Sequence, residues 1–335
     1  MLAAVLLAVA SRLPVPYVRL APGPVFNTLA SYGGHDVIQI SGATTYPTTG
    51  ALDMLTVSEL GGPRSDLSLG VAVWAAFTGD QAVVPQELLY PPDATGDQVD
   101  QANAQAFRSS QQDAVTAAAR QLGVPLTPSA VVSSVVDGGP AAGKLRPGDV
   151  VVSIDGSPVH TGEDVGRLIR AKPVGTDLSF AVRRDDADTN VTVTSGPSPR
   201  DPAVPYVGIS VATVENPPFS VTITLDDVGG PSAGLMFALG IVDKLTVDQL
   251  TGGRVVAGTG TIDADGAVGA VGGIRQKAAA AAGAGAQLFL MPQSLCSELA
   301  GHVPDGLQVT PVATLDGAVK AIDQWRAGAA IPACS

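Results

Sequence analysis

The chain has 335 residues, which predicts more than one domain because single domains commonly hold ~100 to 200 residues. Hydrophobic residues make up 45% and charged residues 15%, and this balance excludes a disordered chain. The formal net charge of −12 and the lack of any basic run argue against nucleic acid as a partner, since phosphate backbones would be repelled.

The N-terminus is apolar from Leu2 to Ala10 and continues into Ser11 and Arg12. This run is shorter than the ~20 residues of a membrane-spanning helix. It also lacks the basic start and small-residue cleavage site of a signal peptide. We interpret residues 1–14 as the second half of a transmembrane anchor that begins upstream, with a buried first helix as the alternative.

The cysteine and histidine residues do not form a metal-binding pattern. Cys296 and Cys334 lie 38 positions apart, and the three histidines are isolated. In an exported domain the two cysteines would form a disulfide worth ~3 to 4 kcal/mol, whereas in the cytosol they would be free thiols. We therefore predict no metal site and leave the state of the cysteines open.

The first part of the chain alternates apolar runs with glycine-rich turns. We expect strands at "DVIQIS" (36–41), "ALDMLTVS" (51–58) and "DLSLGVAVWAAF" (66–77). From Gly96 to Leu122 the sequence becomes polar and predicts a helix whose apolar side carries Phe107 and Val115.

Residues 129–195 read as a separate unit. A strand from Val131 to Val136 leads through "GGPAAGKLRPGDVVVSIDG" to a helix that Thr161 caps, with Asp164 three residues further on. This unit resembles a PDZ domain of the bacterial protease-associated type. The resemblance implies capture of a peptide C-terminus by strand addition beside that helix. We expect the carboxylate-binding loop just before Val131, in "GVPLTPSA" (123–130).

The last part of the chain, from residue 201, alternates strands and helices. It predicts an apolar helix from Ser232 to Lys244, a helix from Ile274, the strand "AQLFLMP" (286–292) and a final helix carrying Trp325. The expected fold class is therefore α/β (α+β).

Ser232 and Lys277 are the candidate nucleophile and general base. No histidine lies near a glycine-framed serine, so a lysine would have to take the proton, which requires its pKa to fall from ~10.4 toward ~7 to 8. Ala278 to Ala282 are apolar, and no acidic residue occurs between Gly266 and Leu295. Arg275 nearby would further disfavour a second positive charge. This setting suits an uncharged amine.

The turn before the apolar helix favours acyl transfer. Gly229 and Gly230 allow close approach of a substrate backbone, and Pro231 sets the entry to the helix. Free N–H groups around Ser232 and Ala233 would stabilise an oxyanion. From spacing alone, a phosphate-binding helix start and a solvated lysine remain alternatives.

The segments "GGPSAGLMFALGIVD", "AGTGTIDADGAVGAVGGIRQKAAAAAGAGA" and "LFLMP" resemble the proteolytic domain of Lon-type serine peptidases, in the same order. The resemblance implies that Ser232 is the nucleophile, Lys277 the general base, and Thr259 a residue that hydrogen-bonds the lysine. Gly229 stands where many such enzymes have an acidic residue. The GxxxxGK[ST] loop of an ATP-driven unfoldase is missing from the sequence.

The whole layout resembles the membrane-anchored, PDZ-containing Lon-like proteases of the YlbL type. This implies a protease domain in two parts, residues 15–122 and 198–335, separated by a PDZ domain at 123–197. It also implies a single-pass cell-membrane protein with both domains on the extracytoplasmic side. The expected partners are protein or peptide substrates and the membrane, with no cofactor, and homo-oligomerisation is left open.

We predict an ATP-independent serine endopeptidase that hydrolyses unfolded or exposed protein segments. The alternative is a non-catalytic PDZ adaptor on a Lon-like scaffold. A phosphate-binding or kinase-like protein is a third hypothesis, and a nucleotide-dependent thermal shift would be its signature.

Overall fold

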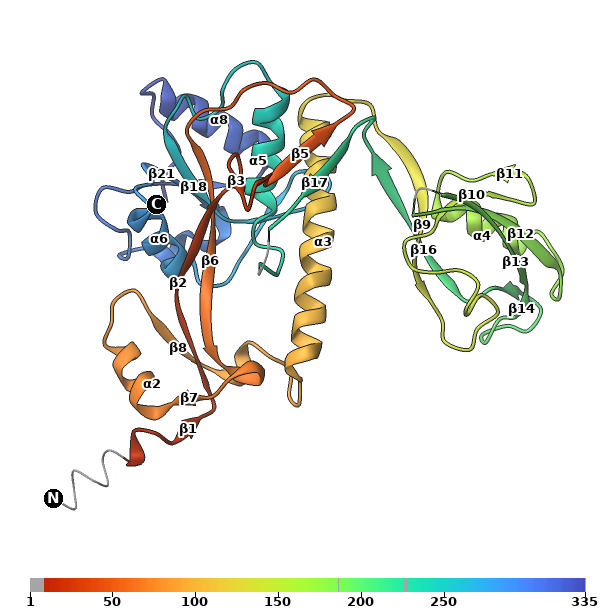
Figure 1. Ribbon diagram of the computed structural model, residues 1–335, viewed down its shortest axis with the longest axis horizontal. Helices are drawn as coiled ribbons and strands as arrows, with labels where there is room; N and C mark the ends of the chain where they lie inside the picture. Colours follow the sequence, from red (N-terminus) through yellow and green to blue (C-terminus); the bar gives the residue numbers. More distant parts are fainter. Residues whose placement is uncertain (1–8, 186, 226–227, 335) are drawn as a thin grey trace. The chain divides into compact units, whose positions relative to one another are not determined.

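The computed structural model describes residues 9–185, 187–225 and 228–334 (Figure 1). The chain divides into two compact units: residues up to 124 together with those from 219 onward form one, and Pro125–Pro218 form the other. Both units mix helices and strands, which confirms the expected fold class. We call them the protease unit and the PDZ unit, after the families that their sequences resemble.

A six-stranded sheet forms the centre of the protease unit. Its strand order is β22-β21-β18-β6-β2-β8. The first four strands are parallel, and β2 runs antiparallel to both of its neighbours. The bounds are Gln308–Val312 (β22), Leu288–Pro292 (β21), Val255–Gly258 (β18), Ala51–Gly61 (β6), Tyr17–Asn27 (β2) and Ala82–Pro85 (β8).

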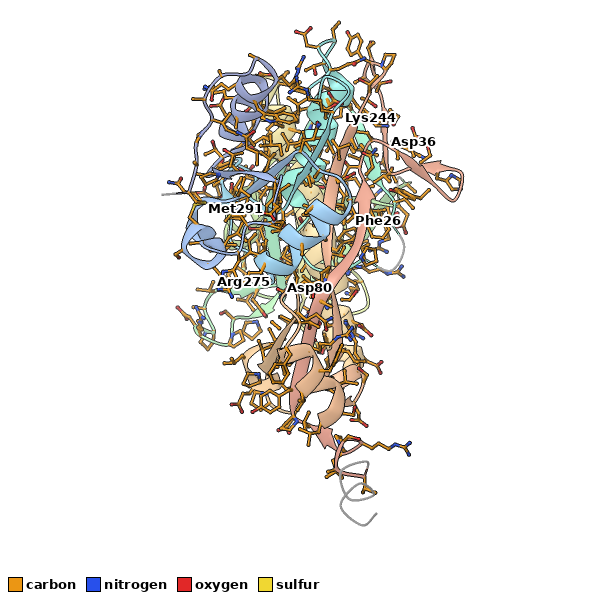
Figure 2. All side chains as sticks on the ribbon, turned by 90° about the vertical axis from the view of Figure 1, so that its left-hand side faces the viewer. Phe26, Asp36, Asp80, Lys244, Arg275 and Met291 are labelled. Carbon is orange, nitrogen blue, oxygen red and sulfur yellow. A yellow bond between two sulfur atoms is a disulfide. The ribbon has the colours of Figure 1, made fainter. Side chains whose placement is uncertain are left out.

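Helices cover both faces of this sheet because successive strand residues point to opposite sides. Helix α6 (Ile274–Gly283) lies across β2 and β6, where its alanines pack against Leu55, Ala257 and Phe289 (Figure 2). Met54 and Val256, the neighbours of Leu55 and Ala257 in their strands, point to the opposite face of the sheet and are also buried. Helices α5 (Gly234–Leu245), α3 (Gly96–Gln121) and α8 (Leu315–Arg326) pack together.

Helix α3 follows the sequence prediction closely. Thr95 caps it through a reciprocal capping box with Gln98. Phe107 is buried and packs edge-on against Phe237 of α5, with ring centroids 5.7 Å apart. The predicted helix from Ile274, the strand over 288–292 and the final helix are confirmed as α6, β21 and α8.

One predicted strand is wrong. Residues 66–77 form the two-residue strand β7 (Leu67–Ser68) and then helix α2 (Leu69–Ala76), rather than one long strand. Strand β1 (Pro14–Val15) pairs only with β7, and the carbonyls of Ser11 and Leu13 accept from the first N–H groups of α2. A short, wholly apolar run has no periodicity that separates helix from strand, so only these contacts decide its structure.

Short elements complete the protease unit. Strand β17 pairs antiparallel with β5, β19 with β20, and β3 with β4. Their bounds are Ser220–Ile223 (β17), Ile38–Ser41 (β5), Thr261–Ile262 (β19), Val268–Gly269 (β20), Ser31–Tyr32 (β3) and His35–Asp36 (β4). Single turns occur at Gly62–Arg64 (η1), Gln86–Leu88 (η2), Gln293–Leu295 (η3) and Cys296–Leu299 (α7).

The PDZ unit is a sheet with one helix. Strands run in the order β13-β12-β10-β9-β16, and β11 also pairs with β10. Helix α4 (Gly162–Arg170) begins at Thr161, whose capping box with Asp164 is confirmed. The strands are Thr127–Val135 (β9), Val150–Ile154 (β10), Ser157–Pro158 (β11), Asp177–Arg184 (β12), Ala187–Thr194 (β13), Gly196–Pro197 (β14), Pro205–Tyr206 (β15) and Ile209–Asn216 (β16).

The PDZ unit extends beyond the expected end at residue 197. Strand β16 pairs with β9 along its whole length, from Ile209 opposite Val135 to Asn216 opposite Thr127. Residues 198–218 therefore belong to this unit rather than to the protease unit, where the sequence analysis placed them. Strand β15 lies within residues 198–218, and the strand after it, β16, is the partner that β9 requires.

The C-terminus is fastened to the protease unit. Cys296 and Cys334 are joined by a disulfide, the outcome that the sequence analysis tied to an exported domain. The Thr310 hydroxyl also donates to the Pro332 carbonyl at 2.7 Å. Among the described residues no helix is long and apolar enough to cross a bilayer, and most of the predicted anchor at 1–14 lies in residues 1–8, outside them.

Asp53 is a buried acid in the middle of the sheet. It lies on β6 between Ala257 of β18 and Asn27 of β2, and only 7% of it is exposed. Burial raises the pKa of its carboxyl to about 6. Since the folded-state pKa exceeds the unfolded value, the folded state binds more protons between these two values, and stability falls as the pH rises through this range.

We expect Asp53→Asn to stabilise the chain at neutral pH and to have little effect in acid. The gain in unfolding free energy at about pH 7 should reach up to ~3 kcal/mol, since each pKa unit corresponds to about 1.4 kcal/mol. Chemical denaturation at about pH 4.5 and about pH 7 measures the difference. Destabilisation at about pH 7 that is much smaller at about pH 4.5 would show that the charged carboxylate has a structural role.

Candidate active site

The turn that carries Ser232 is held by helix α3. The Gly230 N–H donates to the carbonyl of Asn103 at 3.0 Å, and the Ser110 hydroxyl donates to the carbonyl of Pro231 at 3.0 Å. Helix α5 begins at Gly234, so Ser232 lies two residues before it and not at its first position as predicted. The side chain is half-buried at the edge of the helix start.

The residues after β18 bind this turn from the other side. The carbonyl of Ser232 accepts from the Gly260 N–H at 3.0 Å and from the Thr259 hydroxyl at 3.1 Å. The first turn of α5 approaches closely: a Cβ on Gly234 would lie 2.7 Å from the Ser110 hydroxyl. Only glycine fits at that position, which explains the glycine of the "PSAG" motif.

Lys277 lies in the first turn of α6 with its amine inside the protein. Only 3% of the residue is exposed, and Nζ donates to the Thr259 hydroxyl at 3.1 Å. Burial lowers the pKa of this amine to about 8. The lysine is therefore held in an environment that favours its neutral form more strongly than water does.

Two neighbouring residues explain how Lys277 is placed. Gly273 caps α6 with a φ of +67°, and a Cβ there would lie 2.7 Å from a methyl group of Val57. Arg275, which we expected to repel a second positive charge, instead donates through Nε to the Glu298 carbonyl at 3.0 Å. Burial, rather than repulsion from Arg275, lowers the lysine pKa.

The structure thus connects the three predicted residues in one chain of contacts. Thr259 is fully buried, accepts from Lys277 and donates to the main chain of Ser232. The described contacts include no direct hydrogen bond between Ser232 Oγ and Lys277 Nζ, so Thr259 links them. The arrangement supplies a hydroxyl, a buried amine and a hydroxyl that orients the amine.

The N–H groups at this turn are of two kinds. Those of Gly234 and Leu235 are used, since they donate to the carbonyls of Pro231 and Gly260. Those of Ser232 and Ala233 have no acceptor among the described residues. Two N–H groups beside a half-buried hydroxyl can receive an external oxygen. Pro231 has no N–H, and the Gly230 N–H is already used by the Asn103 carbonyl.

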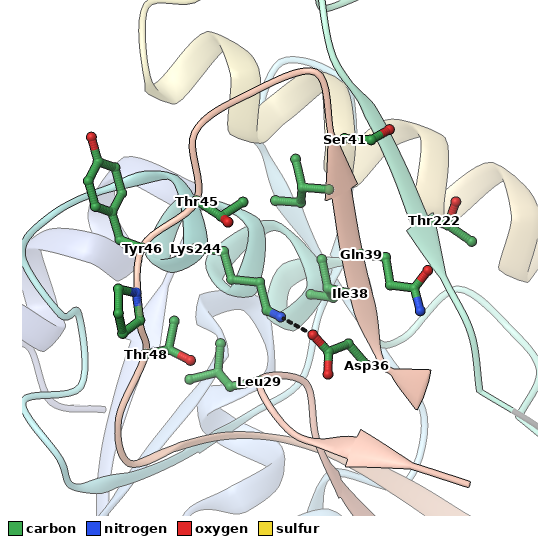
Figure 3. A pocket seen from close by; sticks show the side chains of 12 residues that line it. Leu29, Asp36, Ile38, Gln39, Ser41, Thr45, Tyr46, Thr48, Thr222 and Lys244 are labelled. Carbon is green, nitrogen blue, oxygen red and sulfur yellow. Dashed lines mark hydrogen bonds and ion pairs between the residues drawn. The ribbon is translucent and has the colours of Figure 1, made fainter. Parts of the chain in front are cut away.

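A cavity of the protease unit lies away from this site. It measures about 720 Å³ and contains Lys244, which donates to Asp36 at 3.4 Å (Figure 3). Lys244 lies near the C-terminal end of α5, and a helix of 12 residues rises ~18 Å. None of the predicted site residues lines this cavity. No group of three metal-binding side chains occurs among the residues that the structure describes.

The PDZ unit has a groove of about 300 Å³ between α4 and the chain from Val204 to Val211. Residues 127–130 of the expected carboxylate loop at 123–130 belong to β9 and pair with β16, and none of residues 123–130 borders this groove. The groove is instead bordered by Tyr206-Val207-Gly208-Ile209. The hydrophobic-Gly-hydrophobic pattern of these four residues was the signal that could have located it.

Comparisons with known proteins agree with this division. A family model of the Lon protease (S16) C-terminal proteolytic domain matches residues 226–323, and a PDZ domain model matches residues 106–194. The first match contains Ser232, Thr259 and Lys277. The second reaches back into α3 and stops before β15 and β16.

Several curated proteins match part of the chain. The Magnetosome formation protease MamE of Paramagnetospirillum magneticum is 34% identical over 98 residues, which are 29% of this chain and 12% of that protein. A probable periplasmic serine endoprotease DegP-like of Pseudomonas fluorescens is 34% identical over 84 residues, 25% of this chain and 18% of that protein. The chain thus matches less than a fifth of the length of either.

Among solved structures, the PDZ domain of the SdrC-like protein of Listeria innocua matches with 24% identity and a TM-score of 0.23, covering 25% of this chain and 92% of that one. The two family matches in one chain confirm the resemblances drawn from the motifs. The chain carries a Lon-type proteolytic domain together with a PDZ domain, the combination of a Lon-like serine protease that contains a PDZ domain.

Proposed function

We propose that the chain is an ATP-independent serine endopeptidase that uses Ser232 and Lys277 as a catalytic dyad. The observation that carries this proposal is the buried amine of Lys277, which is bonded to the hydroxyl of Thr259 and has no acidic partner among the described residues. A serine requires a base to become a nucleophile at neutral pH, and a lysine with a pKa near 8 is partly neutral there.

In the proposed acylation step, Ser232 Oγ attacks the carbonyl carbon of the scissile bond while neutral Lys277 takes the hydroxyl proton. The resulting oxyanion accepts from the free N–H groups of Ser232 and Ala233. Lys277 then gives its proton to the leaving amine as the C–N bond breaks. Serine is left esterified and lysine neutral.

Deacylation repeats the sequence with water. Neutral Lys277 takes a proton from water while the water oxygen bonds to the carbonyl carbon of the ester. Lys277 then returns the proton to Ser232 Oγ as the ester bond breaks. Thr259 keeps the amine directed toward the turn in both steps, since it accepts from Nζ and donates to the Ser232 carbonyl. The low-dielectric site favours the neutral form of the lysine between steps more than water would.

The substrates that suit this site are unfolded or exposed protein segments. The sequence contains no nucleotide-binding loop of the GxxxxGK[ST] type that would drive unfolding. The joined cysteines and the apolar N-terminal sequence support a membrane-anchored protein whose domains lie on the extracytoplasmic side.

The PDZ unit is proposed to bind the C-terminus of a substrate chain. A peptide would lie in the groove beside α4, and its carboxylate would accept from the N–H groups of Val207 and Gly208, which have no acceptor among the described residues. Val165 and Ile169 would contact its apolar last side chain.

The dyad predicts a specific pattern of activity. Ser232→Ala and Lys277→Arg should each reduce cleavage of a disordered protein such as casein by ~10⁴-fold or more, since arginine does not deprotonate. In the parent chain the rate should rise with pH through about 8, because the neutral amine is the active form. Peptide-bond cleavage and labelling by a serine-reactive probe are the measurements.

Lys277→Met is the matched control for folding. It should be inactive yet more stable than the parent at neutral pH, because it removes the free-energy cost of burying a charge. If the parent is never labelled under any condition, the chain is a PDZ adaptor on a protease scaffold. Retained cleavage in Lys277→Arg would remove the lysine from the mechanism.

Thr259 is proposed as a positioning residue. Thr259→Val keeps the side-chain shape but removes the hydroxyl, so we expect kcat to fall by ~10²-fold and stability by ~1 to 3 kcal/mol. Thr259→Ser should restore most of the activity and keep the inflection near pH 8. A valine variant with the parent's rate and pH profile would show that the hydroxyl serves folding alone.

The PDZ groove predicts preference for a free peptide C-terminus. Gly166 lies on α4 at the groove, and Gly166→Leu should fill the groove while favouring the helix by roughly 1 kcal/mol. We expect apolar-ended peptides to bind the parent, and to lose binding after C-terminal amidation or in Gly166→Leu. Glu163→Leu, on the exposed side of α4, is the matched control. Equal binding of amidated and free peptides would contradict carboxylate recognition.

A further inference from the structure

Large apolar side chains are exposed together around helix α2. Trp74 is 71% exposed and Phe77 is 85% exposed. Large side chains grouped with other exposed apolar residues are unusual on the surface of a monomeric soluble domain. We define the α2 patch as the exposed side chains of Val9, Leu13, Leu69, Val73, Trp74 and Phe77.

These side chains form one surface because the N-terminal segment is bonded to the helix. The Leu69 N–H donates to the Leu13 carbonyl at 2.9 Å, and the Gly70 N–H donates to the Ser11 carbonyl at 2.8 Å. Leu69, Val73 and Phe77 follow one another at four-residue spacing and so share one side of the helix. The opposite side is occupied, since Ala72 and Ala75 are buried.

The charge of this surface differs from that of the chain. The whole chain has a net charge of −12, yet residues 9–17 and 69–77 contain no aspartate or glutamate. The charged side chain within these stretches is that of Arg12, which is exposed. An apolar surface with a cation at its border complements the interface of a membrane with anionic head groups.

The sequence immediately before the patch is also apolar. Residues 2–8 read "LAAVLLA" and continue directly into Val9, the first residue of the patch. A chain that enters a bilayer through this segment brings Leu13 and α2 to the bilayer surface, because the hydrogen bonds above fix α2 beside residues 11–13. Tryptophan and phenylalanine favour this interfacial layer.

We propose that the α2 patch lies in the interfacial layer of a phospholipid bilayer and forms a second membrane contact beside the N-terminal segment. Trp74 and Phe77 lie among the head groups and upper acyl chains, and Arg12 faces lipid phosphates. This inference rests on the proposed membrane anchoring and is independent of the dyad. It fixes the height of the protease unit above the bilayer, which a flexible anchor alone would not do.

Trp74 can report this contact directly, because the chain has two tryptophans and Trp325 is buried with Arg254 4.9 Å over its ring. The full chain with Trp325→Phe is reconstituted into vesicles of zwitterionic and anionic phospholipid, with and without brominated acyl chains. We expect Trp74 emission to shift to shorter wavelength and to be quenched by the brominated lipid. Co-flotation with the vesicles reports anchoring separately.

The double variant Val73→Asp, Phe77→Asp should lower the partition of the α2 patch from water into lipid by more than about tenfold. Quenching of Trp74 should then be abolished, while flotation persists. Val247→Asp, which replaces an exposed apolar residue outside the patch, should leave the quenching unchanged. If the chain with the intact patch floats with the vesicles but Trp74 is not quenched, the second contact is overturned. If that chain does not float, the anchoring is overturned as well. A blue shift that grows with protein concentration without lipid would overturn the proposal in favour of a second copy. Labelling of Ser232 by a serine-reactive probe tests the dyad independently of all these outcomes.

Discussion

The candidate site depends on one constraint: a lysine amine is kept inside the protein, and among the residues that the structure describes no carboxylate is bonded to it. Burial of a charged amine is unfavourable, so the site favours the neutral form of Lys277 and lowers its pKa to about 8. The hydroxyl of Thr259 gives the amine a polar contact without supplying a negative charge. A nearby aspartate or glutamate would reverse this effect by stabilising the ammonium.

The sheet and helices around Lys277 keep its amine inside the protein. The alanines of α6 allow the helix to lie close to β2 and β6, so solvent does not reach the amine from that side. Strand β18 brings Thr259 and Gly260 to the same place, and both donate to the carbonyl of Ser232. Because β6 comes from before the PDZ unit and β18 from after it, both parts of the protease unit are needed to build one site.

The PDZ unit shows a similar dependence on a distant segment. Its sheet requires β16, and the loop that precedes this strand borders the groove beside α4. The groove is therefore bordered by residues that follow the β12–β13 hairpin and not by residues that precede β9. The N–H groups of Val207 and Gly208, which have no acceptor among the described residues, then lie at the border of a groove that also includes Arg170 and Ser198.

By itself the sequence determined the fold class and Ser232 and Lys277 as candidates, because apolar periodicity, glycine spacing and charge depletion are local properties. Its resemblance to a Lon-type domain and a PDZ domain added Thr259 as a candidate. The tertiary structure alone decided that residues 66–77 contain a helix, that the PDZ unit ends at Pro218, and that its groove is bordered by 206–209. It also joined Cys296 to Cys334 and assigned the low lysine pKa to burial and not to Arg275. These features depend on strand partners and neighbours far apart in the chain, which no local pattern records.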